Sequence, residues 1–175
     1  MTEAQLSNAM DAYGSTVYRL ALTRMQNIAD AEDVYQEVFL RLWKQAAEDW
    51  DGDRAKAWLI RTTLNRCADL HRFHLRRPVL SFAEIPDLAQ PEDESRELWE
   101  AVSRLPEKAR TAVHLYYAEG YSAEEISQLM HIPAATVRTR RHRARKQLKE
   151  LLGGIDDETC VSRSDGTNFG PQRAE

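Results

Sequence analysis

Seven basic residues stand close together in the segment TVRTRRHRARKQLKELL, Thr136–Leu152. They make up half of the fourteen residues from Thr136 to Lys149, although the chain of 175 residues has a formal net charge of −4. Guanidinium groups pair with phosphates and with guanine edges, so this segment predicts contact with a nucleic acid. A basic helix alone also fits a solvated face, or a surface that binds RNA or an acidic protein without sequence preference.

The residues before this segment predict how it is positioned. Gly120 follows HLYYAE, where a helix would end in a left-handed residue, and Ser122 with Glu125 makes a capping box for the next helix. The short turn His131–Pro133 then leads into the basic helix, because proline suits the first turn of a helix. Two helices joined this tightly predict a helix-turn-helix, whose second helix lies in the DNA major groove.

Helical spacing divides the basic segment into two faces. The face expected toward the domain core carries Val137, Ala144, Leu148 and Leu151. The face expected toward DNA carries Arg138, Arg140, Arg143 and Arg145.

The segment DAEDVYQEVFLRLWK, Asp30–Lys44, predicts a helix with a wide apolar face, opened by Asp30 as its N-cap. Its two apolar lines are Val34, Val38 and Leu42, and Tyr35, Phe39 and Trp43. The pattern fits a core helix, or a half-exposed helix that docks a partner. The interspersed charged residues favour docking, because charged groups are seldom buried unpaired.

Aromatic and cationic residues are interleaved in a third segment, expected as a helix from about Arg54 to Arg76. Single-stranded nucleic acid binds such surfaces, because bases stack on rings while cations hold the backbone. The rings are Trp50, Trp58 and Phe73, among the cations Arg54, Lys56, Arg61, Arg66, Arg72, Arg76 and Arg77. Trp58 also fits a core position.

Composition excludes several classes of protein. The chain is globular, with 42% apolar and 30% charged residues, and no stretch approaches the roughly 18 apolar residues of a membrane helix. Because no basic leader precedes an apolar run, we expect a cytoplasmic protein. Motifs for phosphate loops, nucleophilic serines and zinc proteases are missing, so we expect neither an enzyme nor a cofactor. Cys67, His71 and His74 share one helix, which rarely supplies three zinc ligands, so we expect no metal site.

Spacing of three and four, with almost no strand alternation, predicts an all-α fold of two small helical domains. We expect the first domain over residues 1–76, with one of its helices near Tyr13–Met25. A proline-containing linker is expected over 77–95, the second domain over 96–152, and a polar, disordered tail over 153–175.

Three segments, in this order, resemble the extracytoplasmic-function (group 4) sigma factors of bacterial RNA polymerase. DAEDVYQEVFLRLWK is similar to region 2.2 and AWLIRTTLNRCADLHR to regions 2.3 and 2.4. LPEKARTAVHLYYAEGYSAEEISQLMHIPAATVRTRRHRARKQL is similar to region 4. The resemblance extends over Leu6–Leu152 and implies a protein that binds core RNA polymerase and directs promoter-specific initiation.

The resemblance also implies which residues make each contact. The β′ clamp helices of the polymerase would contact Asp33, Gln36, Glu37, Phe39, Leu40 and Trp43. The minus-ten element would be recognised by Trp50, Asp51, Arg54, Trp58, Arg61, Asn65, Arg66, Asp69, Arg72 and Arg76, with a flipped base held in the loop before the third helix. The minus-thirty-five duplex would contact Thr136, Arg138, Thr139, Arg140, Arg143 and Arg145, partly through its shape. The polymerase β flap and an anti-sigma factor are further implied partners.

Three residues depart from the family pattern: His131 and Ala135 replace common glycines, and Arg141 replaces a leucine. Arg141 lies on the core-facing stripe, so either an apolar contact is lost or its guanidinium extends outward. The alternative function is a free-standing helix-turn-helix regulator, or an adaptor for some other protein. A repressor needs neither the docking helix nor the aromatic and basic one. Because an acidic chain binds duplex DNA weakly by itself, the net negative charge also favours a protein that gains DNA affinity once it is anchored to polymerase.

Overall fold

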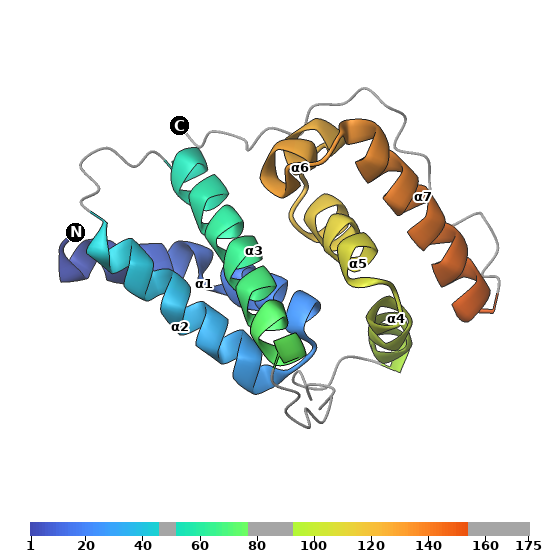
Figure 1. Cartoon of the computed structure of the whole chain (residues 1–175), viewed down its shortest axis with the longest axis horizontal. Helices are drawn as coiled ribbons and strands as arrows, with labels where there is room; N and C mark the ends of the chain where they lie inside the picture. The colour runs from blue at the N-terminus through green and yellow to red at the C-terminus, as the bar shows by residue number, and fades with distance from the viewer. Residues whose placement is uncertain (46–51, 77–92, 154–175) are drawn as a thin grey trace.

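The computed structural model describes residues 1–45, 52–76 and 93–153. Within these residues the chain forms seven α-helices, one π-helical turn and no strand, which confirms the all-α fold. The three N-terminal helices lie together on one side of the molecule, and the C-terminal helices gather on the other (Figure 1).

The N-terminal domain consists of α1 (Glu3–Met25), α2 (Ile28–Lys44) and α3 (Gly52–Arg76). α1 begins well before the expected Tyr13, because Thr2 and Gln5 form a capping box across its first turn. The expectation that Asp30 caps α2 is wrong. Asn27 is the N-cap, and its side-chain oxygen accepts the N–H of Asp30 at 2.9 Å. Asp30 therefore lies in the first turn of α2, where its charge still suits the helix dipole.

Buried side chains from all three helices form the core of this domain. The expected apolar line of α2 is confirmed: Val34, Val38 and Leu42 are all buried. They pack with Val17, Ala21, Leu59 and Cys67, and Trp58 is partly buried at the edge of the cluster. The tryptophan at position 58 is thus mainly a packing residue.

The C-terminal domain consists of α4 (Asp93–Ser103), α5 (Glu107–Val113), the π-helical turn η1 (His114–Ala118), α6 (Ala123–Met130) and α7 (Ala134–Leu151). α4 begins at Asp93, so residues 93–95 of the expected linker are helical. The predicted signals for the end of the preceding helix and the start of α6 are confirmed. Gly120 has φ +76°, and Ser122 and Glu125 form a reciprocal capping box.

The two domains pack against each other. Leu20, Ile60 and Leu64 of the N-terminal domain join a buried cluster with Leu115 and Ile126 of the C-terminal domain. The buried guanidinium of Arg110 adds polar contacts at the end of α1. It donates to the carbonyl oxygens of Thr23 and, at 3.1 Å, of Arg24. The last turn of α1 is therefore held by a side chain from the other domain.

Candidate nucleic-acid and protein-binding surfaces

α6 and α7 form the predicted helix-turn-helix. His131 ends α6 at φ 52° and ψ 46°, in the left-handed region that glycine adopts without strain. The N–H groups of His131 and Ile132 both donate to the carbonyl of Ser127. Pro133 then occupies the N-cap position of α7, without a side-chain hydrogen bond to the helix. The turn therefore forms with histidine at the position where the family pattern has glycine.

α7 presents its basic residues outward. Val137 and Ala144 are buried and Leu148 is half-buried, as the spacing predicted. The expectation for Leu151 is wrong: this side chain is 37% exposed, because it lies in the last turn of the helix. Among the residues expected to contact the minus-thirty-five duplex, Thr136 and Arg140 are half-buried, and the exposed ones are Arg138, Thr139, Arg143 and Arg145.

Two of these side chains have partners within the domain. Arg138 pairs with Glu124, which lies in the first turn of α6. Both side chains are more than half exposed, so the pair contributes little stability, and a phosphate can take the place of the carboxylate. The hydroxyl of Thr139 donates to the carbonyl of Ala135 at 2.9 Å.

Arg141, a departure from the family pattern, lies over an aromatic ring. Its guanidinium carbon is 3.3 Å from the ring centroid of Tyr116 and 6.0 Å from that of Tyr117. Its Nε is buried without a hydrogen bond in the described part of the chain. Neither of the two expected outcomes, a lost apolar contact or a guanidinium that extends outward, describes Arg141 fully. The side chain stays at the domain surface as a packing group, through a cation–π contact.

The outward face of α3 is polar and charged. Arg61, Asn65, Asp69 and Arg72 are spaced by four, four and three residues and are all exposed, as is Arg54. Arg72 donates to the carboxylate of Asp69 at 2.8 Å, in an exposed ion pair within α3. Arg66 is half-buried. The expected minus-ten residues Trp50 and Asp51, like the side chain of Arg76, lie outside the described residues.

α2 exposes a second surface, made of apolar and acidic side chains. Leu40 is 52% exposed and Trp43 is 42% exposed, and Asp33 and Gln36 lie on the same side of the helix. Glu37 is half-buried and accepts from Arg41 at 2.9 Å, a hydrogen bond that lowers the pKa of the Glu37 carboxyl.

Phe39 does not belong to this exposed surface. Only 4% of its surface is accessible, and its ring packs 4.8 Å from that of Tyr35. The structure therefore places Phe39 in the domain core, because α1 covers this side of α2. In the described structure its ring lies behind the exposed surface, and its expected contact with a partner stays a prediction.

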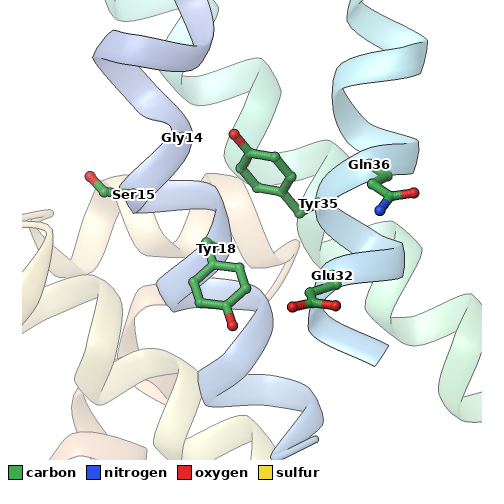
Figure 2. A pocket seen from close by; sticks show the side chains of 6 residues that line it. All are labelled: Gly14, Ser15, Tyr18, Glu32, Tyr35 and Gln36. Carbon is green, nitrogen blue, oxygen red and sulfur yellow. The ribbon is translucent and has the colours of Figure 1, made fainter. Parts of the chain in front are cut away.

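A pocket of about 460 Å³ lies between α1 and α2, beside this surface. Tyr18 and Tyr35 project into the space between the two helices, and Gln36 lies at its edge (Figure 2). Gly14 allows the helices to approach, since a Cβ atom there would lie 3.0 Å from the hydroxyl of Tyr35. Sequence reasoning missed this pocket, because it did not reveal which side chains α1 places against α2.

Sequence reasoning also missed a polar cluster between the domains. Glu119, whose side chain is 4% exposed, lies 3.3 Å from Lys56 and 3.7 Å from Arg19, and it accepts from the hydroxyl of Thr16 at 3.1 Å. Next to it, His114 Nδ1 is 3.2 Å from the hydroxyl of Thr23. Burial lowers the pKa of His114 to about 4, although the nearby Glu119 acts in the opposite direction.

The three candidate metal ligands of α3 lie in different surroundings. Cys67 is buried in the N-terminal core, and burial raises the pKa of its thiol to about 12. His71 lies near Glu107 of the other domain, and His74 lies 3.6 Å from Asp30 of α2. Across residues 1–45, 52–76 and 93–153, no three ligand-type side chains converge, and no helix is long and apolar enough to span a membrane.

Both domains match families of known proteins. Residues 9–77 match sigma-70 region 2, and residues 95–148 match sigma-70 region 4. The sequence is 34% identical over 161 residues to the extracytoplasmic-function sigma factor SigE of Mycolicibacterium smegmatis, covering 86% of this chain and 62% of SigE. It is 32% identical over 155 residues to SigM of Bacillus subtilis, covering 83% of this chain and 94% of SigM.

The chain therefore spans less than two thirds of the length of SigE, and 39% of another relative. Among solved structures, the fold is similar to that of the sigma factor RpoE of Bartonella quintana in complex with the anti-sigma factor NepR. The TM-score is 0.73 at 23% identity, with 87% of this chain and 99% of RpoE covered.

Proposed function

Because the chain belongs to the extracytoplasmic-function sigma factors of the sigma-70 family, we propose that it binds core RNA polymerase and directs promoter-specific initiation. One observation supports this proposal independently of family membership. The described structure has an exposed apolar and acidic surface on α2 and separate cationic surfaces on α3 and α7. A protein that must hold both a polymerase and two stretches of promoter DNA needs such a division.

Polymerase binding is assigned to α2. Leu40 and Trp43 supply apolar area that is exposed in the free chain, and Asp33, Gln36 and Glu37 surround it with polar groups. Aromatic side chains at the centre of an interface carry much of its binding energy, often about 2 kcal/mol or more each. We place the β′ clamp helices on this surface and the β flap on the C-terminal domain.

Recognition of the minus-ten element is assigned to α3. The exposed row Arg61, Asn65, Asp69 and Arg72 gives cations and hydrogen-bonding groups along one face. Such a face suits a single strand, whose phosphates need cations and whose bases offer polar edges once they are unpaired. Trp58 supports this face from the core, and Trp50 and Asp51 stay as predictions for the base pocket.

Recognition of the minus-thirty-five duplex is assigned to α7. In a helix-turn-helix the second helix enters the major groove with its N-terminal residues against the base edges. Thr136, Thr139 and Arg140 lie in this part of α7, while Arg143 and Arg145 are positioned for phosphates. Arg138 is assigned to DNA after its release from Glu124.

We place the protein in the cytoplasm, with no catalytic activity of its own and with an anti-sigma factor as a protein inhibitor. The solved relative RpoE is itself bound to the anti-sigma factor NepR, which supports this class of partner. A regulator that acts without polymerase is disfavoured, because it would not require the exposed surface of α2.

The test is binding of the purified full-length chain to bacterial core polymerase, followed by strand opening on a library of promoter fragments. Unpaired thymines are detected by permanganate. Opening that requires both chain and polymerase supports the proposal and yields the promoter sequence. Binding to duplex DNA by the chain alone, with no affinity for polymerase, would favour the free-standing regulator.

A further inference from the structure

A basic pocket of about 290 Å³ lies between the start of α5 and the middle of α7. Its charged and polar lining side chains are Lys108, Arg140, Arg143 and Gln147, and no described residue that lines it is a carboxylate. The three cations form no ion pair among residues 1–45, 52–76 and 93–153. Like charges that share a pocket repel each other, so an acidic group is stabilised there.

The chain itself carries an acidic segment directly after α7. This segment consists of Asp156, Asp157 and Glu158, and no basic residue stands between Gly153 and Arg163. It lies outside the described residues, and neither polymerase binding nor promoter recognition has used it. Its three carboxylates match the three cations of the pocket in number and are opposite in charge.

The end of α7 brings the acidic segment within reach of the pocket. Gly153, at φ +73°, has the left-handed conformation that ends a helix and turns the chain away from its axis. At about 1.5 Å per helical residue, Gln147 lies about 9 Å before Gly153 and Arg143 about 15 Å. The five residues from Gly153 to Glu158 span about 17 Å when extended. The segment is therefore long enough to run back along α7 to the pocket.

The short connection to α7 favours this contact. Exposed ion pairs are individually weak, so three of them would not hold a separate acidic peptide firmly. Only Gly154 and Ile155 stand between the described end of α7 and the acidic segment. A group on so short a connection has an effective concentration of about millimolar at a neighbouring site. Binding within one molecule therefore requires little intrinsic affinity.

We propose that the acidic segment Asp156–Glu158 binds this pocket in the free chain and competes there with promoter duplex. The inference rests on the proposed function of α7, because Arg140 and Arg143 are among the residues assigned to the minus-thirty-five element. The segment lowers the affinity of the free chain for duplex DNA. Once core polymerase holds promoter DNA beside α7, the duplex displaces the segment.

The contact is tested by NMR on the full-length chain with a nitroxide label on Cys160. Cys67 is buried, so it does not compete for the label. We expect the label to broaden the amide resonances of Lys108 and Arg140. The combined substitutions Asp156→Asn, Asp157→Asn and Glu158→Gln should restore both resonances, whereas Asp165→Asn, farther along the chain, should leave them broadened.

Two results of this experiment would overturn the inference. Broadening confined to the last turn of α7 would show that the segment does not reach the pocket. Equal broadening of an isotope-enriched chain by a separate labelled chain would show that the segment binds a second copy instead.

The competition is tested by measuring the affinity of the chain alone for a promoter duplex at about 50 mM salt. We expect the triple substitution to raise this affinity about tenfold, within the range of three exposed ion pairs. In a Lys108→Ala background the gain should be smaller, because the pocket has already lost one cation. An equal gain in both backgrounds, or no gain, would overturn the competition, since net charge alone would account for the first result.

Failure of the proposed function would be recognised separately. Polymerase assembled with the wild-type chain would then bind no promoter, while broadening at Lys108 and Arg140 would still establish the contact of the acidic segment with the pocket.

Discussion

The carboxylate of Glu119 lies 3.3 Å from the ammonium group of Lys56, so an ion pair joins the C-terminal domain to α3 of the N-terminal domain. The proposed function requires this contact to break. The minus-ten and minus-thirty-five elements are separated by about 25 base pairs, or about 85 Å at roughly 3.4 Å per pair. A compact chain of this length has a radius of gyration of about 16 Å, too small to reach both elements.

Glu119→Ala should therefore favour the open arrangement of the two domains. The substitution removes the acceptor shared by Lys56, Arg19 and Thr16 and leaves two cations facing each other, at a cost of about 2 kcal/mol to the domain contact. Small-angle X-ray scattering should show a larger radius of gyration for the free chain. Glu124→Ala is the control, because its partner Arg138 lies in the same domain. Identical scattering from Glu119→Ala and wild type would show that the cluster does not hold the domains together.

The same interface predicts a pH dependence of stability. Burial lowers the pKa of His114 from 6.5 to about 4, so between these values the unfolded chain binds more protons than the folded one. Stability is then complete above pH 6.5 and falls as the pH drops toward 4, by at most about 3 kcal/mol. Urea denaturation across this range measures the effect.

His114→Gln should flatten that dependence, whereas His142→Gln, at an exposed position, should preserve it. If the free energy of unfolding changed with pH equally in wild type and in His114→Gln, His114 would be excluded as the titrating group.

Phe39→Ala should destabilise the N-terminal domain, because its ring is buried against Tyr35. Truncation of a buried phenylalanine typically costs about 3–5 kcal/mol. Trp43→Ala, at an exposed position of the same helix, should change the free energy of unfolding by less than about 1 kcal/mol. Chemical denaturation of both variants distinguishes the two roles. A fully stable Phe39→Ala variant would contradict the placement of this ring in the core.

Arg141→Leu should leave DNA binding nearly intact. In the free chain the guanidinium of Arg141 lies on the ring of Tyr116, so we expect it to stay there and to make no phosphate contact. The salt slope of promoter binding should stay at its wild-type value, while Arg143→Ala should lower it by about 0.9. A drop of that size in Arg141→Leu would place its guanidinium on DNA instead.

Local signals made part of this molecule predictable. The capping box of Ser122 and Glu125, the left-handed Gly120 and the outward arginines of α7 depend on residues within a few positions of one another. The N-cap of α2 shows the limit of such signals, because Asn27 and Asp30 both suit that position, and only the path of the chain out of α1 decides between them.

Long-range contacts were not predictable from one sequence. Thr16 and Glu119 are 103 residues apart and meet only because the domains pack together. Phe39 and Trp43 belong to the same apolar line of α2. The position of α1 decides that Phe39 is buried and Trp43 is exposed. The spacing of Arg141 predicts a lost apolar contact or an exposed charge, and it gives no sign of the Tyr116 ring beneath the side chain.

The central claim, that one chain carries separate surfaces for polymerase and promoter, is tested most directly by measuring both affinities for two variants. Trp43→Ala should weaken binding to core polymerase by about thirtyfold, the equivalent of 2 kcal/mol. Arg140→Ala should keep wild-type affinity for core polymerase, while the assembled complex binds promoter DNA more weakly. Met10→Ala, an exposed apolar residue of α1, is the control. Loss of both affinities in both variants, or loss of neither, would contradict the account.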